Sequence, residues 1–392
     1  MHIIEEVLFM LITNGKVFLE DRIIENGYVH IIEDKIIDVG DMKHLNIKDD
    51  EMIDAKGNNV VPGFIDQHIH GANGADHMDA TRDAIHTIAS FLPKEGTTSF
   101  LSTTMTQSVE AVSKALEVIS DYAEKENGPG EAEVVGIHLE GPFINVKHIG
   151  AQNPLYVLEP NEEDFMTFWK ASKESIRLIT YAPELAQPGF TSMLRKHNVV
   201  PSAGHTDAYY DDIVEEIDQG LSNLTHFHNA MTPHHHRTPG AVTAGFLHPE
   251  LKAEMIVDGI HLNPTTVKAT VSIKGTDHCI AITDAMRAKG LPDGKYDLGG
   301  QEVTKIGKEC RIANGALAGS VAEMDFVLRN LKEFTGCSMR DIVKMGSYNA
   351  ARHLGLDNKG VIGIGKDADV VICDDSINIK STICRGVLAY SA

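Results

Sequence analysis

The feature that most constrains the fold is an alternation of strand-like and helix-like segments through the middle of the chain, about residues 61–356. Short runs rich in β-branched residues recur there, most of them followed by a segment with helical periodicity. We expect eight strands, at about 61–68, 97–104, 133–139, 176–181, 199–203, 221–225, 251–257 and 279–283. Repeated strand–helix units form a parallel sheet, and eight of them predict an α/β fold of the (β/α)8 TIM-barrel type. An open, doubly wound sheet is the alternative.

Both ends of the chain have a different pattern. Residues 1–60 and 357–392 are rich in short strands and turns. We therefore expect a small β-sandwich domain formed by both chain termini, with the barrel at 61–356 between them. The dipeptide Asn14-Gly15 is typical of two-residue hairpins and predicts a turn after the first strand. Segment 286–318, rich in Gly and Lys, is expected to form a hairpin insertion after the last barrel strand.

Composition and charge argue against several classes of protein. With 35 Lys and Arg against 56 Asp and Glu, the net charge is −21, which argues against a general affinity for nucleic acid or for an anionic membrane. No stretch of about 18 apolar residues occurs, so no transmembrane span is expected. The first residues carry two acids where a signal peptide needs a basic region. The five cysteines form no CxxC pair. We therefore expect a cytoplasmic protein without a disulfide framework.

The first barrel strand carries a pair of histidines. The apolar run Val60–Ile65 leads into His68 and His70, and side chains at positions i and i+2 of a strand lie on one face. Both imidazoles therefore project the same way and supply half of a metal site. The alternative, two polar residues on an exposed strand edge, fits poorly with so apolar a run. Asp66 is expected to orient the metal ligands rather than to react.

Other residues of the metal-binding type stand at the ends of further strands. They are Glu140, His205, His226 and Asp284. Barrel enzymes gather their catalytic groups at the C-terminal ends of the strands, so these side chains are expected to meet. Imidazoles with a carboxylate suit zinc or another divalent transition metal. An aspartate beside such an ion suits proton transfer between water and a leaving amine.

These segments resemble the amidohydrolase superfamily and, within it, the family of N-acetylglucosamine-6-phosphate deacetylases. The matching segments follow the family's order over nearly the whole chain; they are Pro62–Gly71, His138–Phe143, Ala203–Asp207, Thr225–Met231, Val257–His261 and Ile282–Ala285. The Leu-Glu-Gly-Pro-Phe and His-x-x-Asn-Ala-Met signatures among them are specific to the deacetylases. The resemblance also implies the β-sandwich from both termini, and usually a homodimer.

The resemblance implies a metal-dependent enzyme. Its first metal position matches Glu140, His205 and His226. His68 and His70 match those members that build a second position, whereas other members use one ion. One or two divalent ions per subunit, zinc or iron, are therefore implied.

The remaining roles are also implied by the resemblance. Asp284 matches the catalytic aspartate. Asn229, with the backbone at Ala230, matches a cradle for the substrate phosphate, and His261 matches a substrate-contacting histidine. Arg237 matches an arginine that reaches the phosphate from the neighbouring subunit of a dimer.

The implied reaction is hydrolysis of the acetamide of N-acetylglucosamine 6-phosphate to glucosamine 6-phosphate and acetate, in amino-sugar catabolism. Some family members carry His where this chain has Gln152, so polarisation of the carbonyl is open between Gln152 and a metal. The turn Leu317–Ser320 is expected to open a helix whose free N–H groups could meet substrate. No residue identifies the configuration at the sugar C4, so the galactosamine epimer or another amide stays an alternative. A barrel that has lost its metal and serves as a scaffold is a remoter one.

Overall fold

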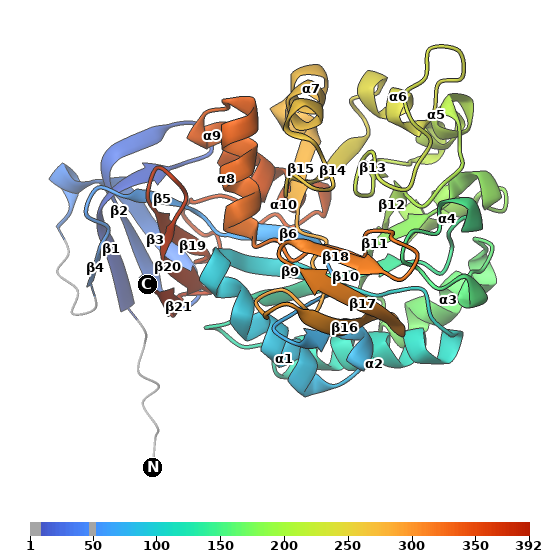
Figure 1. Cartoon of the computed structure of the whole chain (residues 1–392). Coiled ribbons are helices and arrows are strands. Elements are labelled where there is room, and N and C mark those ends of the chain that lie inside the picture. Colours follow the sequence, from blue (N-terminus) through green and yellow to red (C-terminus); the bar gives the residue numbers. More distant parts are fainter. Residues whose placement is uncertain (1–8, 47–51) are drawn as a thin grey trace.

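The computed structural model describes residues 9–46 and 52–392, so residues 1–8, on which the signal-peptide prediction mostly rests, lie outside the described residues. At its centre is a parallel sheet of eight strands in the order β15-β14-β13-β12-β11-β10-β9-β6 (Figure 1). The strands are β6 (Phe64–Ile69), β9 (Thr97–Thr103), β10 (Glu133–Glu140), β11 (Ile176–Tyr181), β12 (Val200–Ala203), β13 (Asn223–Leu224), β14 (Lys252–Ile256) and β15 (Cys279–Ile282). The predicted (β/α)8 barrel is confirmed.

The first and last barrel strands are joined just beyond the end of β15. Ile69 bridges to Ala285, and the His70 N–H donates to the Ala285 carbonyl at 2.8 Å. The Asp284 N–H donates to the His68 carbonyl, also at 2.8 Å. These bonds close the barrel, which excludes the open-sheet alternative. They also hold Asp284 beside His68 of β6 and His70, which follows the strand.

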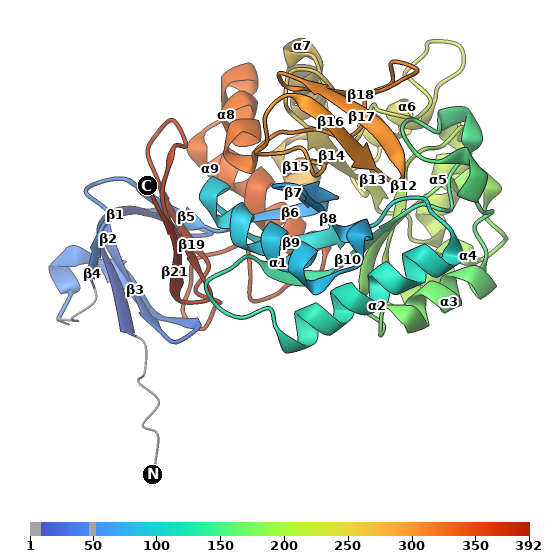
Figure 2. The ribbon, with the colours of Figure 1, turned by 60° about the horizontal axis from the view of Figure 1, so that its bottom comes forward.

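Helices surround the barrel strands (Figure 2). They are α1 (Arg82–Phe91), α2 (Val109–Lys125), α3 (Glu162–Ala171), α4 (Phe190–Lys196), α5 (Tyr210–Gln219), α6 (Ala241–Leu247), α7 (Pro264–Lys274), α8 (Met324–Thr335), α9 (Met339–Val343) and α10 (Asn349–His353). In α2, Ser108 caps the first turn, and Val112, Ala115, Leu116 and Ile119 form the buried stripe. Among the described residues, no helix combines the length and the apolar composition that a membrane span needs.

Strands from both ends of the chain share a second sheet, in the order β21-β20-β19-β5-β1-β2-β3 with β4 beside β1 (Figure 1). They are β1 (Phe9–Phe18), β2 (Ile23–Ile32), β3 (Lys35–Asp41), β4 (Met52–Asp54), β5 (Asn59–Pro62), β19 (Val370–Cys373), β20 (Ile379–Cys384) and β21 (Val387–Ser391). The Ile36 N–H donates to the Lys366 carbonyl at 2.9 Å, and the Ala368 N–H to the Asp34 carbonyl at 2.8 Å. The sheet therefore curls around one apolar core. The β-domain from both termini is confirmed, while its boundaries at residues 60 and 357 stay predictions.

Two local predictions near the terminal sheet were wrong. The strand expected at 61–68 is two strands, β5 in the terminal sheet and β6 in the barrel, separated by Gly63. A Cβ on Gly63 would lie 2.0 Å from Oγ1 of Thr98, so the backbone passes this neighbour closely only as glycine. Asn14-Gly15 forms no hairpin turn, because β1 runs through it with a register shift. A Cβ on Gly15 would lie 2.3 Å from Val60, so tertiary packing rather than turn chemistry explains the glycine.

The predicted insertion is a three-stranded antiparallel sheet of β16 (Gly294–Leu298), β17 (Gln301–Ile306) and β18 (Glu309–Ile312). Its buried residues pack on Met105 and Ala151 of the barrel loops. A smaller hairpin, β7 (Gly71–Ala72) with β8 (Ala75–Asp76), follows β6. The turn Leu317–Ser320 does not open a helix. Ser320 instead bridges to Ala285, and α8 begins at Met324.

Candidate active site

A cavity of about 180 Å³ lies at the C-terminal ends of the barrel strands. The predicted site residues that line it are His70, Glu140, Gln152, His205, His226, Asn229, Ala230, His261 and Asp284. His68 lies behind them and is fully buried. Leu298 and Leu317 of the insertion contribute apolar side chains to the cavity wall, as does Met105, which packs in the same cluster as Leu298. The structure therefore brings together every predicted site residue except Arg237.

Three ligand-type side chains from three different strand ends meet at one carboxylate oxygen. Oε1 of Glu140, the last residue of β10, lies 3.5 Å from Nε2 of His205 and 3.3 Å from Nε2 of His226. The two histidine Nε2 atoms are 3.1 Å apart. This first group is one that could hold a metal ion.

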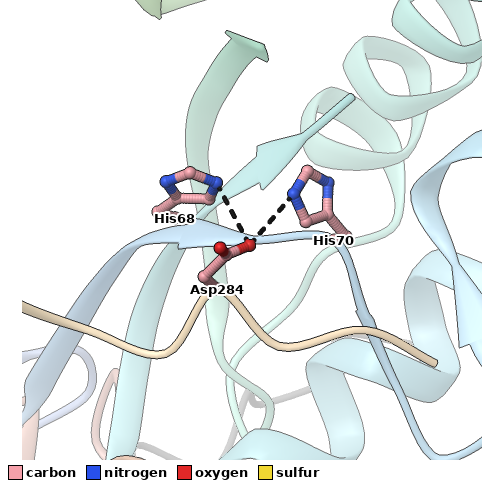
Figure 3. A group of neighbouring side chains, drawn as sticks. All are labelled: His68, His70 and Asp284. Atoms are coloured by element: carbon pink, nitrogen blue, oxygen red, sulfur yellow. Dashed lines mark ion pairs between the residues drawn. The ribbon is translucent and has the colours of Figure 1, made fainter. Parts of the chain in front are cut away.

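A second group lies next to the first (Figure 3). Oδ1 of Asp284 lies 3.4 Å from Nε2 of His68 and 3.2 Å from Nε2 of His70. Nε2 of His70 is also 3.3 Å from Oε2 of Glu140. The two histidines project toward the same carboxylate, as their spacing on β6 predicted.

The donor atoms of both groups fit divalent ions. Nε2 of His68 and Oδ1 of Asp284 are buried and make no hydrogen bond, which is costly unless another partner is present. In a tetrahedral site with bonds of about 2.1 Å, ligand atoms are about 3.4 Å apart. The separations within the two groups, from 3.1 to 3.5 Å, match that spacing.

The histidine of β12 is oriented by the backbone. Nδ1 of His205 donates to the carbonyl of His148 at 2.7 Å. Its proton must therefore sit on Nδ1, which leaves Nε2 with a free lone pair toward Glu140. This is the protonation state that a metal ligand needs.

Gln152 is engaged at both ends of its amide. Its Nε2 donates to Oε2 of Glu140 at 2.7 Å, and its Oε1 accepts from the Thr106 N–H at 2.8 Å. The side chain therefore fixes the orientation of a metal ligand and is not free to reorient without breaking two buried bonds.

His261 enters the cavity wall from the loop after β14. Its Nδ1 donates to Oδ2 of Asp258 at 2.7 Å, and Asp258 also accepts from the N–H groups of Ile260 and His261. Burial would raise the pKa of Asp258, but the hydrogen bonds and charge of His261 lower it. The carboxylate therefore holds the imidazole with Nε2 as its free nitrogen.

The predicted phosphate-binding residues are divided between two places. Asn229 and Ala230 line the cavity, where Nδ2 of Asn229 donates to the His226 carbonyl at 3.1 Å. Arg237 is exposed on the following loop, outside the cavity, and its Nη1 lies 2.7 Å from Nε2 of His236. Within one chain, then, Arg237 does not meet the other site residues.

The amidohydrolase family model matches residues 59–389, which is most of the chain. The chain belongs to the amidohydrolase family. The predicted resemblance is thereby confirmed.

Relatives of this amidohydrolase include several named enzymes. It is 40% identical over 384 residues to the N-acetylglucosamine-6-phosphate deacetylase of Bacillus subtilis, covering 97% of each chain. It is 35% identical to the N-acetylgalactosamine-6-phosphate deacetylase of Escherichia coli O157:H7, covering 84% of this chain and 87% of that one. Among solved structures, a mutant N-acetyl-D-glucosamine-6-phosphate deacetylase of Mycobacterium smegmatis, in complex with N-acetyl-D-glucosamine-6-phosphate, superposes with a TM-score of 0.90. It is 28% identical, with 98% of this chain and 100% of that chain covered.

The amidohydrolase site contains one charged residue that the sequence analysis missed. Glu254 lies in the middle of β14 and is fully buried inside the barrel, where it bonds to His68 and to the backbone of His226. Its sequence signal was a lone acid within the apolar run 251–257. A charged side chain inside a buried strand needs partners, and that requirement alone could have singled it out.

Charge balance couples the two groups of the amidohydrolase site. Burial would lower the pKa of His68 and His70, but the carboxylates of Asp284 and Glu140 raise it, to about 9 and about 10. Burial would raise the pKa of Glu140, yet the histidines hold it well below its usual range. Protons and a metal cation therefore compete for the same nitrogen atoms.

Proposed function

We propose that this amidohydrolase hydrolyses the acetamide of N-acetylglucosamine 6-phosphate, giving glucosamine 6-phosphate and acetate. The observation that carries the proposal is the convergence of Glu140, His205 and His226 with Asp284 in a cavity that Asn229 also lines. The names of the Bacillus subtilis relative and of the Mycobacterium smegmatis structure support the substrate. The reaction belongs to amino-sugar catabolism, and a cytoplasmic location follows from the proposal, since phosphosugars do not cross membranes unaided.

Divalent ions are assigned to the two ligand groups. The first would be held by Glu140, His205 and His226, and the second by His68 and His70 beside Asp284. When bound, such an ion activates water and polarises the acetamide carbonyl. Both zinc and iron suit imidazole and carboxylate ligands, so elemental analysis of protein purified without chelator is the measurement that separates them.

Asp284 is the proposed proton carrier. It takes the proton of the attacking water and delivers it to the departing sugar nitrogen, which leaves poorly as an unprotonated amine. Burial would raise the pKa of Asp284, but in the metal-free chain the charges of protonated His68 and His70 lower it, to about 2. A metal cation in their place would also favour the ionised carboxylate, which is the form that can accept a proton. Its backbone is fixed on both sides, by the His68 carbonyl and by the Ser320 N–H at 2.7 Å.

The other residues bind the substrate. Asn229 and the backbone at Ala230 cradle the phosphate, and His261 contacts the sugar through Nε2. Because Arg237 is exposed and does not line its own cavity, we assign it to the site of a second copy in a homodimer. Gln152 holds Glu140, which supports leaving the polarisation of the carbonyl to a metal.

A second candidate substrate is N-acetylgalactosamine 6-phosphate, favoured by the Escherichia coli relative of that name. Acetate release from the two hexosamine phosphates and from a hydantoin separates the possibilities. We expect the highest kcat/KM with the glucosamine compound. Faster release from the galactosamine compound would overturn the substrate but keep the chemistry, and no release from any of them would indicate a scaffold without catalysis.

A further inference from the structure

We propose that Glu254 is a positioning residue that sets the affinity of the second metal position, formed by His68 and His70. The inference rests on the metal ions of the proposed function but not on its substrate. Glu254 touches neither the cavity nor the expected path of substrate, because it lies beneath the site in the barrel interior. It acts instead through His68.

The carboxylate of Glu254 has a donor at every acceptor position. Oε1 accepts from Nε2 of Gln67 at 2.7 Å and from Nδ2 of Asn223 at 2.9 Å. Oε2 lies 3.2 Å from Nδ1 of His68 and accepts from the His226 N–H at 3.2 Å. Four partners on or beside β6 and β13 therefore hold one buried charge on β14.

The bond to His68 decides which of its nitrogens can bind a metal. A carboxylate accepts only from a protonated nitrogen, so Nδ1 carries the proton, and in the neutral imidazole that binds a metal Nε2 is the nitrogen with the lone pair. That Nε2 lies 3.4 Å from Oδ1 of Asp284 and 3.5 Å from Oε1 of Glu140. A carboxylate partner also makes the imidazole a stronger ligand, and loss of such a partner typically weakens metal binding about 10–100-fold.

The first position has a different kind of support. His205 donates to a backbone carbonyl, that of His148, which carries no net charge. His226 meets Glu254 only through its backbone N–H. Removal of the charge on Glu254 should therefore weaken the second position selectively and leave the first nearly unchanged.

The test compares Glu254→Gln with Glu254→Asp and with Asn223→Ala. The matched control, Asn223→Ala, removes a bond to the same carboxylate without touching His68. Metal content and chelator competition with zinc give the affinity of the first and second equivalents, while circular dichroism checks that each metal-free variant is folded. We expect Glu254→Gln to weaken the second equivalent about 10–100-fold and the first less than about threefold. Glu254→Asp should recover part of the loss, and Asn223→Ala should lose little.

A double variant makes the test specific. If Glu254 acts through His68, adding Glu254→Gln to His68→Ala should lower zinc affinity no further than His68→Ala alone. Equal weakening of both equivalents, additive loss in the double variant, or a folded Glu254→Gln with unchanged affinity would overturn the inference. Failure of acetate release with the expected zinc pattern would overturn only the proposed substrate.

Discussion

The metal-type centre at one end of the barrel and the junction between barrel and terminal sheet both gather carboxylates at one point. At the junction, Glu133, Asp367 and Asp369 surround Nζ of Lys359 at 2.6, 3.0 and 2.6 Å. The oxygen atoms of the three carboxylates lie close enough together to hold a metal ion, as do the ligand atoms at the barrel mouth. At the junction, however, the positive charge is supplied by the chain itself.

At the barrel mouth, the described residues that line the cavity include no lysine or arginine, so the positive charge must come from protonated imidazoles or from a metal ion. The carboxylates of this centre face imidazole nitrogens, and Nε2 of His68 and Oδ1 of Asp284 have no hydrogen-bond partner. A cluster of acidic side chains therefore indicates a metal site only where the atoms that could coordinate the metal have no partner within the protein. At the junction, burial would lower the pKa of Lys359 and the three carboxylates raise it, so the ammonium keeps its charge and locks the two domains together.

The largest expected effect is loss of the proton carrier in the centre. Asp284→Asn keeps size and polarity but cannot accept a proton, so we expect kcat to fall about 10²–10⁴-fold, with metal content little changed. Steady-state kinetics with elemental analysis of the same sample provide the measurement. Near-normal kcat in the metal-loaded variant would remove Asp284 from the mechanism and make His261 the next candidate.

The junction is tested by removing its cation. Lys359→Ala leaves the buried Asp369 without its ion-pair partner, whereas Asp367 keeps Lys35 and Glu133 still faces Arg385. The change should cost about 3–5 kcal/mol of unfolding free energy, measured in urea. Active-site metal content should stay as in the wild type.

The same variant sharpens the comparison. With the ammonium gone, the carboxylates become a set of hard oxygen ligands, so millimolar Ca²⁺ should recover part of the lost stability. The wild-type protein should show no such response. If Ca²⁺ stabilised the variant and the wild type equally, ligand atoms without a partner would not be what distinguishes a metal site from an ion-pair cluster.

A smaller effect is expected when the two metal groups are compared by the metal content of their variants. Oε1 of Glu140 faces three of the four histidines of the site, so Glu140→Ala should leave less than about half an equivalent of metal. His68→Ala should retain about one equivalent in the first group. Elemental analysis of both variants, purified without chelator, decides this, and equal loss in both would mean that the two positions fill only together.

The smallest effect is expected at the exposed arginine. Arg237→Ala should raise KM about tenfold with little change in kcat, because its proposed contact is only with the non-reacting phosphate. Mixing this variant with Asp284→Asn tests whether Arg237 reaches the site of the neighbouring subunit. In a mixed dimer, one site would then contain both an intact Asp284 and an intact Arg237. Recovery of activity on mixing is expected, and its absence in confirmed mixed dimers would place Arg237 outside the neighbouring site.

Much of the fold could be predicted because its signals are local. The strand pattern identified β11 at its observed bounds, and the ends of predicted strands carried the metal-type residues. The partners of Glu254 could not be found in this way, since Gln67 and Asn223 are far apart in the chain and only the folded barrel brings them together. The hydrogen bonds at both ends of the Gln152 amide could not be predicted for the same reason.

The shared sheet of the two termini has a consequence for synthesis of the protein. β5 ends at Pro62, and its antiparallel partner β19 begins at Val370. About 300 residues must be added between them, which takes roughly 15–60 s at the usual rate of translation. During that time one edge of the apolar strand β5 has no hydrogen-bonding partner, and such an edge favours aggregation. The nascent chain should therefore depend on chaperones until its last strands emerge from the ribosome.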